Sequence, residues 1–148
     1  GTSISKNQAD GVDFEDGANN NWLGGTSELE RNIVSGNQSE GIEVSHNSRT
    51  QFNHVAGNWF GVDAFGDPAG NGDNGVSMED LANNNYIYNN LISHNGDSGF
   101  RTWVLADENQ VYDNTITNNK RNGVYLFGGS QHNLIRNNVI ANNSDRGV

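Results

Sequence analysis

The stretch that decides the fold is Asn114-Thr-Ile-Thr-Asn-Asn-Lys-Arg-Asn-Gly-Val-Tyr-Leu126. Its pattern of Asn-x-apolar, a second Asn, and then Gly with alternating apolar residues returns around Asn90 and Asn138, at the same interval on either side. Glycines followed by an apolar residue keep this spacing, at positions 75, 99, 123 and 147. A fixed interval of about 20 to 50 residues is the signature of a repeat architecture.

The repeat extends toward the N-terminus with longer intervals. The steps from Gly11 to Gly41 and from Gly41 to Gly75 both exceed the step from Gly75 to Gly99. The additional residues of the Gly41–Gly75 step include 58–70, which we expect to form a loop that leaves the repeat, and such loops carry function more often than regular elements do.

Each repeat contains three short runs of alternating apolar residues, as at 123–127, 133–135 and 139–141. Such alternation marks strands, and the intervening Asn and Gly residues mark turns. Three short strands and their turns fill about 24 residues, which is one coil of a solenoid. We therefore predict an all-β fold, a right-handed parallel β-helix of about six coils, as a single domain over residues 1–148; the handedness follows from the preference for right-handed connections.

The composition fits this fold. Only 32% of the residues are hydrophobic, because each coil needs few inward side chains, and Asn is the commonest residue with 27 copies. Asn tolerates left-handed backbone at turns, and stacked Asn side chains can bond to one another along the axis. We expect these asparagines to be structural.

The net charge of −10 excludes two classes of partner. Only 8 residues are basic, and they form no cluster, so nucleic acids and anionic membrane surfaces are not expected as partners. The sequence has no apolar run of about 18 residues that could span a bilayer.

The motif resembles the right-handed parallel β-helix repeats of carbohydrate-processing proteins, the group that includes NosD-like proteins and mannuronan epimerase modules. The resemblance rests on Asn114–Leu126, Asn90–Thr102 and Asn138–Val148 and covers essentially the whole chain. It implies an extracellular or cell-surface module that interacts with polysaccharide, from an enzyme of the lyase, epimerase or hydrolase class. The alternative is a non-catalytic structural or adhesive stalk.

Strand alternation predicts which side chains face outward. The second and fourth residues after each repeat glycine share one outer face, acidic in the early coils and cationic and aromatic in the later ones. We expect a polysaccharide groove on this face, whose candidate substrate-binding residues are Trp103, Phe127, Glu79 and His46. The alternative is that the aromatic side chains cover a loop or another part of the protein.

Two chemistries are open on this face. In a lyase or epimerase, Arg101 would neutralise a uronate carboxylate and Tyr125 would exchange the proton, with Glu43 and Asp80 assisting. In a hydrolase, two carboxyl groups would act together, either Asp13 with Glu43 at about 5 Å or Glu43 with Asp80 or Glu79 at about 6.5–9.5 Å.

Calcium is the one candidate cofactor. Asp63, Asp67 and Asp73, in or beside the expected loop, offer the carboxylate oxygens that Ca²⁺ takes. The alternative is an ordinary solvated turn.

The sequence starts and stops within a coil, since residues 3–7 match 115–119 and the last repeat glycine is Gly147. Uncapped coils expose unpaired strand edges. We therefore expect either a piece of a longer solenoid or a homo-oligomer formed through the ends.

Overall fold

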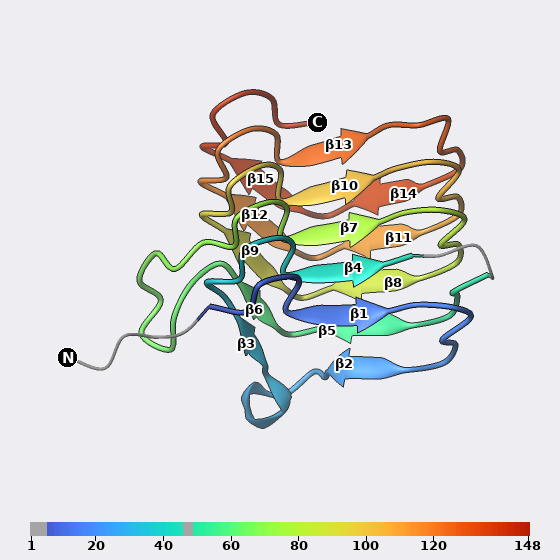
Figure 1. The fold of residues 1–148 in the computed structure, drawn as a ribbon. Helices are drawn as coiled ribbons and strands as arrows, with labels where there is room; N and C mark the ends of the chain where they lie inside the picture. Colours follow the sequence, from blue (N-terminus) through green and yellow to red (C-terminus); the bar gives the residue numbers. More distant parts are fainter. Residues whose placement is uncertain (1–5, 46–48) are drawn as a thin grey trace.

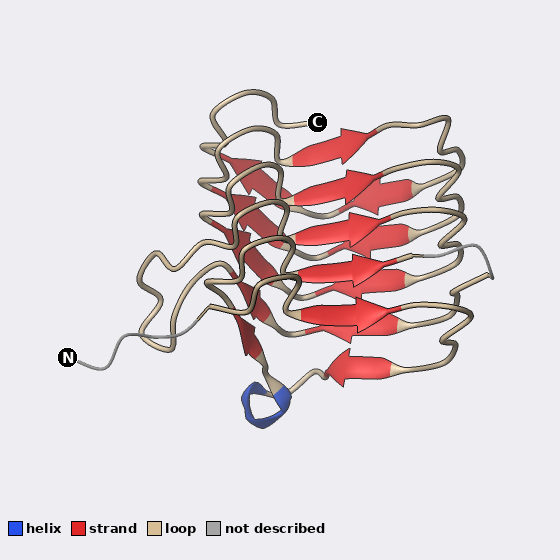
Figure 2. Cartoon of the chain, in the orientation of Figure 1, coloured by secondary structure: helices blue, strands red, loops and turns tan. Residues whose placement is uncertain are grey.

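Residues 6–45 and 49–148, which the computed structural model describes, wind into a stack of coils whose sides are three parallel sheets (Figure 1). Figure 2 shows how little helix interrupts the strands, namely the single short 3-10 helix η1, Glu28–Glu30. Among these described residues, no helix has the length and apolar character needed to cross a membrane.

Each sheet takes one strand from every coil. Sheet A consists of β1 (Val12–Phe14), β4 (Ile42–Val44), β7 (Val76–Met78), β10 (Phe100–Thr102) and β13 (Val124–Leu126). Sheet B consists of β2 (Trp22–Gly24), β5 (His54–Ala56), β8 (Tyr86–Tyr88), β11 (Gln110–Tyr112) and β14 (Leu134–Arg136). Sheet C consists of β3 (Ile33–Val34), β6 (Trp59–Phe60), β9 (Leu91–Ser93), β12 (Thr115–Thr117) and β15 (Val139–Ala141).

The strand register confirms the repeat. Phe100 pairs with Val76 on one side and with Val124 on the other, which is the regular interval of the sequence pattern. The longer interval between Gly41 and Gly75 is also confirmed, because Ile42 pairs with Val76. Within the described residues, five coils supply complete sets of strands, close to the expected number of about six. A sixth begins where the N–H groups of Gly123 and Val124 donate to the carbonyls of Arg146 and Gly147.

The core is a narrow column enclosed by the three sheets. All three contribute fully buried side chains, such as Phe100 from sheet A, Val111 from sheet B and Ile116 from sheet C. Leu126 continues an inward column, yet it is 40% exposed because β13 is the last strand of sheet A. A coil therefore needs its neighbours to complete its core.

Asparagine ladders occupy the three turns of the coil, as predicted. Their members are Asn21, Asn53, Asn85, Asn109 and Asn133; Asn32, Asn58, Asn90, Asn114 and Asn138; and Asn7, Asn37, Asn71, Asn95, Asn119 and Asn143. At Asn90, for example, both the backbone N–H and Nδ2 donate to Oδ1 of Asn114, each at 3.0 Å. Nδ2 of Asn90 also donates to the carbonyl of Val55. Each ladder residue thus satisfies buried backbone groups that the turn leaves without a strand partner.

The repeat glycines are required by close packing. A Cβ added to Gly99 would lie 2.3 Å from Cγ2 of Ile116 and 2.9 Å from the carbonyl oxygen of Gly123. No real side chain tolerates such distances, so the regular glycine period records the approach of successive coils.

Candidate functional site

The outer face of sheet A carries the side chains that the sequence analysis assigned to it. Glu43 pairs with Ser77, Ser77 with Arg101, and Arg101 with Tyr125, so these residues form one vertical column. Ser77 is nevertheless buried, and its hydroxyl donates to Glu79. The column therefore changes from acidic to cationic to aromatic along the stack.

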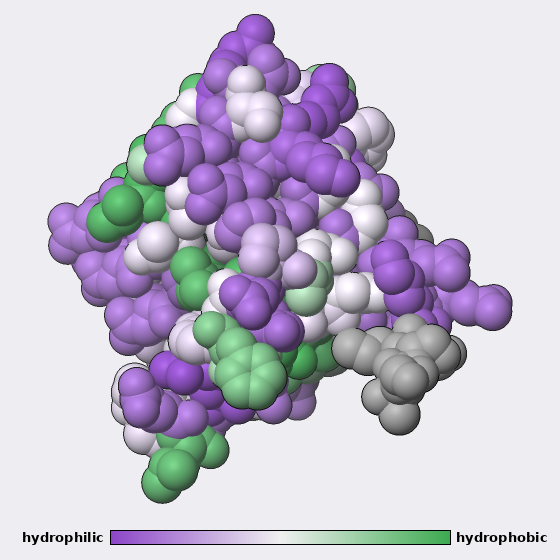
Figure 3. Space-filling view, turned by 90° about the vertical axis from the view of Figure 1, so that its left-hand side faces the viewer, coloured by the Kyte–Doolittle hydropathy of each residue, from purple (hydrophilic) through white to green (hydrophobic). Residues whose placement is uncertain are grey.

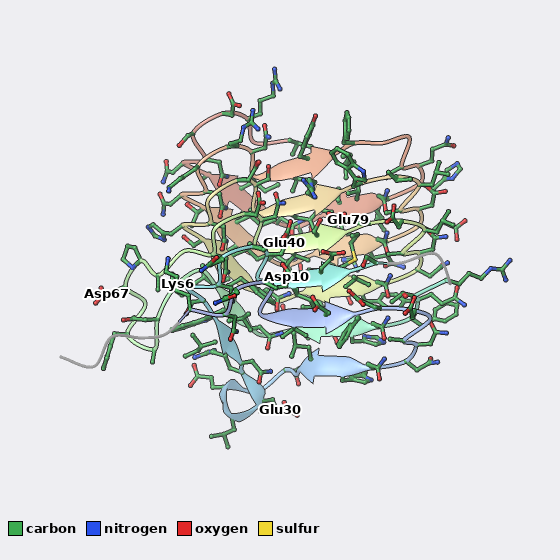
Figure 4. The ribbon with its side chains drawn as sticks, viewed as in Figure 1. Lys6, Asp10, Glu30, Glu40, Asp67 and Glu79 are labelled. Carbon is green, nitrogen blue, oxygen red and sulfur yellow. The ribbon has the colours of Figure 1, made fainter. Side chains whose placement is uncertain are left out.

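An acidic cluster lies at the N-terminal end of this face. One carboxylate oxygen each from Asp10, Glu40 and Glu43 lie within 4.8 Å of one another, a spacing that would also suit a cation. Figure 4 shows Asp10 and Glu40 one above the other beside the starts of β1 and β4, and the backbone N–H of Glu40 donates to Oδ1 of Asp10. Neither Asp10 nor Glu40 was among the residues predicted from the sequence. The available signal was their position, because each directly precedes a repeat glycine.

Glu40 is the most buried carboxyl group of the cluster. It accepts hydrogen bonds from Nδ2 of Asn74 and from the hydroxyl of Ser39. Burial disfavours the carboxylate and raises the pKa of Glu40 to about 7. Nη2 of Arg101 lies 3.8 Å from Oε1 of Glu40. This guanidinium does not offset the rise in the pKa of Glu40, because its closer partner is Glu79.

Burial also raises the pKa of Glu43, which remains partly accessible on the outer face. Arg101 is held between Glu79 and Glu40 by ion pairs, and its buried Nε has no hydrogen-bond partner among the described residues. A uronate carboxylate would have to displace Glu79 to reach this guanidinium. The geometry thus weakens the case for Arg101 as the residue that neutralises a uronate.

Aromatic side chains gather at the C-terminal end of the same face. The ring centroids of Trp103 and Phe127 lie 4.9 Å apart, and those of Tyr125 and Phe127 lie 5.5 Å apart. The guanidinium of Arg101 sits 5.0 Å from the ring centre of Trp103 and joins the aromatic cluster to the acidic one. The three aromatic rings are 36–43% exposed, so they offer partly open faces to a ligand.

The two other residues predicted for this face are Asp80 and His46. Asp80 follows the end of β7 in a left-handed backbone conformation with φ of 44°, and it is not a member of the acidic cluster. His46 lies outside the described residues.

The predicted calcium ligands do not come together. Oδ1 of Asp63 accepts the backbone N–H groups of Phe65 and Asp67, which closes the tip of the 58–70 loop on itself. Figure 4 shows Asp67 out on this loop, well away from Asp10 and Glu40. Asp73 instead acts on Glu40, whose pKa its charge helps to raise. In the described part of the chain these three aspartates form no group with cation-ligand spacing.

A second aromatic surface, on sheet B, was also missed. The rings of Trp22 and His54 stack at 4.0 Å, and those of His54 and Tyr86 stack at 4.7 Å. Burial lowers the pKa of His54, so neutral imidazole is favoured within the stack. The signal was present in the sequence, because all three residues directly follow a ladder asparagine.

The stack of short parallel strands with asparagine ladders defines a class, the parallel β-helix proteins. The family described as right-handed beta helix region matches residues 65–148, more than half of the chain, and the protein belongs to this family. Searches of curated proteins and of solved structures give no significant match.

Proposed function

We propose that this β-helix module binds a polysaccharide on the outer face of sheet A, in an extracellular carbohydrate-active protein. The observation that carries the proposal is the cluster of Trp103, Tyr125 and Phe127, which continues the column of charged residues on that face. Exposed aromatic rings in a row are costly unless something covers them, and sugar rings present apolar C–H faces that stack on such rings. The resemblance to NosD-like and epimerase modules supports the same class of ligand.

The charges of this face favour a neutral polymer. Asp10, Glu40 and Glu43 form the acidic cluster, and the nearby Arg101 is already paired with Glu79. With a net charge of −10, the chain repels polyanions. Carboxylate oxygens accept hydrogen bonds from sugar hydroxyl groups, so the acidic end of the face suits the polar edges of a neutral sugar chain.

The proposal is tested by exchanging one tryptophan on each of two sheets. Trp103→Ala removes an aromatic ring from the outer face of sheet A. Trp22→Ala is the matched control, because it removes a ring from sheet B that is more exposed than that of Trp103. Binding is measured by affinity electrophoresis in gels that contain neutral glucans, mannans or galactans, with alginate as the anionic comparison. We expect Trp103→Ala to weaken binding to one neutral polymer by about tenfold, which is ~1.4 kcal/mol, and Trp22→Ala to leave it unchanged.

Three results would count against the proposal. If Trp103→Ala destabilises the fold by about 3–5 kcal/mol, as a core aromatic would, Trp103 supports packing rather than sugar binding. If Trp22→Ala has the larger effect, the sugar binds on sheet B. If the wild type is not retarded by any polymer, the stalk alternative is favoured.

Glycoside hydrolysis is a second candidate, and the acidic cluster favours it. The carboxyl oxygens of Glu43 and Asp10 lie within 4.8 Å, close to the ~5 Å separation of carboxyl groups in retaining glycosidases. The raised pKa of Glu43 suits a proton donor to the leaving oxygen, and Asp10 would then act as the nucleophile. Glu40 lies buried beside them and would position this pair.

Hydrolysis is tested on the polymer that the wild type binds. Glu43→Gln should abolish the release of reducing ends and leave binding intact, because the amide keeps the size of the side chain but cannot donate a proton as an acid does. Asp80→Asn is the control, since Asp80 lies outside the acidic cluster. Release that persists in Glu43→Gln, or that disappears equally in Asp80→Asn, would rule out this assignment.

A further inference from the structure

A cavity of about 380 Å³ lies on a different face, where the chain turns from sheet C to sheet A. The 58–70 loop contributes Pro68 and Gly70 to its lining, and the turns of later coils contribute His94 and Lys120. Lys6, from the start of the described chain, lines this cavity and also an adjoining hollow of about 260 Å³. Figure 4 shows Lys6 beside the loop.

The charge of this cavity is opposite to that of the protein. The sequence contains two lysines, Lys6 and Lys120, and both line the cavity although they lie far apart along the chain. None of the described residues that line it is acidic, whereas the sequence holds 18 acidic residues against 8 basic ones. Within residues 6–45 and 49–148, neither lysine forms an ion pair, unlike Arg101 on sheet A.

The wall formed by the loop is set by close backbone contact. A Cβ on Gly70 would lie 2.0 Å from the carbonyl oxygen of His94, so the returning loop rests directly on the next turn. Antiparallel pairing of Val62 with Pro68 closes the loop above this contact. The imidazole Nδ1 of His94 is 2.8 Å from the hydroxyl of Ser93, which fixes the ring at the edge of the cavity. The cavity is therefore a built feature of the loop.

We propose that this cavity binds an oxyanion, such as the carboxylate, sulfate or phosphate group of a small ligand. Two ammonium groups that form no ion pair with any described residue attract an anion, and charge-assisted hydrogen bonds to it are stronger than neutral ones. The volume falls within the range of ~300–1,000 Å³ that ligand pockets occupy. Figure 3, which views this side of the molecule, shows a mostly hydrophilic surface. The site is separate from the outer face of sheet A and does not depend on its proposed function.

The test is a titration followed by ¹H–¹⁵N spectra of the backbone amides, with Gly70, Gly96 and His94 as reporters of the cavity. The probes are sodium glucuronate, inorganic phosphate and neutral methyl glucoside. The double variant Lys6→Gln/Lys120→Gln removes both ammonium groups. Arg49→Gln/Arg136→Gln changes the net charge equally at positions that do not line the cavity, and serves as the control.

We expect saturable shifts of the reporter amides with glucuronate or phosphate, at least about tenfold weaker affinity in the lysine variant, and unchanged affinity in the arginine control. Equal affinity for the two anions indicates recognition of the oxyanion alone, and a preference for glucuronate indicates that the sugar ring is also contacted. The proposal is overturned if neither anion shifts the reporters, if methyl glucoside binds as well as glucuronate, or if the two double variants lose affinity equally.

Discussion

Equivalent positions of the repeat carry the same residue in the turn ladders and different residues on the outer face of sheet A. In the turn ladder that contains Asn90 and Asn114, every coil supplies an asparagine, and its amide bonds to the next coil. In the outer column of sheet A, Glu43, Arg101 and Tyr125 occupy equivalent positions and share no chemistry. Identical residues in successive coils stabilise the stack, whereas different residues at equivalent positions allow a binding surface to form.

The largest effect is expected where the repeat is strictest. In Gly99→Ala the new methyl would clash with Ile116 and with the backbone of the next coil, so we expect a loss of about 3 kcal/mol or more in unfolding free energy. Gly147→Ala is the matched control from the same column, where the nearest contact of the Cβ is an ordinary 3.8 Å. Urea denaturation measures both. Equal stability of the two variants would show that coil spacing does not determine the glycine period.

A smaller loss is expected from one ladder amide. Asn90→Ala leaves the carbonyl of Val55 and the N–H of Asn58 without their partners inside the protein, which should cost about 2–3 kcal/mol. Asn89→Gly is the control, because Asn89 is exposed and its positive φ of 56° suits glycine. Thermal unfolding compares them, and a similar melting temperature for both variants would mean that the ladder is not a source of stability.

The carboxyl group of Glu40, in the acidic cluster of the outer face, should lower the free energy of unfolding as pH rises. Because the pKa of Glu40 is about 7 in the folded protein against an ordinary 4.5, the folded state binds more protons between these values. Stability therefore falls as pH rises through this window, by up to about 2–3 kcal/mol from this one group. Glu40→Gln should remove most of that slope in denaturation series at pH 4.5–7.5. A slope that persists unchanged would assign the pH dependence to other groups.

The fold could be predicted from sequence because it depends on spacing. The glycine and asparagine periods fix the register, and the register fixes which side chains of sheet A point outward. The acidic cluster was harder to predict, since Asp10 and Glu40 share a column with Asn74 and so have no repeated chemistry. The pairing of Arg101 with Glu79 also depends on how far a long side chain reaches across coils.

The prediction of a calcium site at the 58–70 loop did not rest on the sequence repeat. The 58–70 insertion leaves the repeat, so no periodic pattern indicates the direction of the Asp63 side chain, whose carboxylate accepts hydrogen bonds from the loop backbone. The cavity beside the later turns could not be predicted from the sequence either, because it brings together Lys6 and Lys120 from different coils.

The most direct test uses the three tryptophans, one associated with each sheet: Trp22 in β2 of sheet B, Trp59 in β6 of sheet C, and Trp103 directly after β10 of sheet A. Their indole N–H signals are followed while an oligosaccharide of the polymer that binds best is added. Sugar binding on the outer face of sheet A predicts that the Trp103 signal shifts with saturation and that the other two stay in place. A shift of Trp22 or Trp59 with Trp103 unmoved would contradict it.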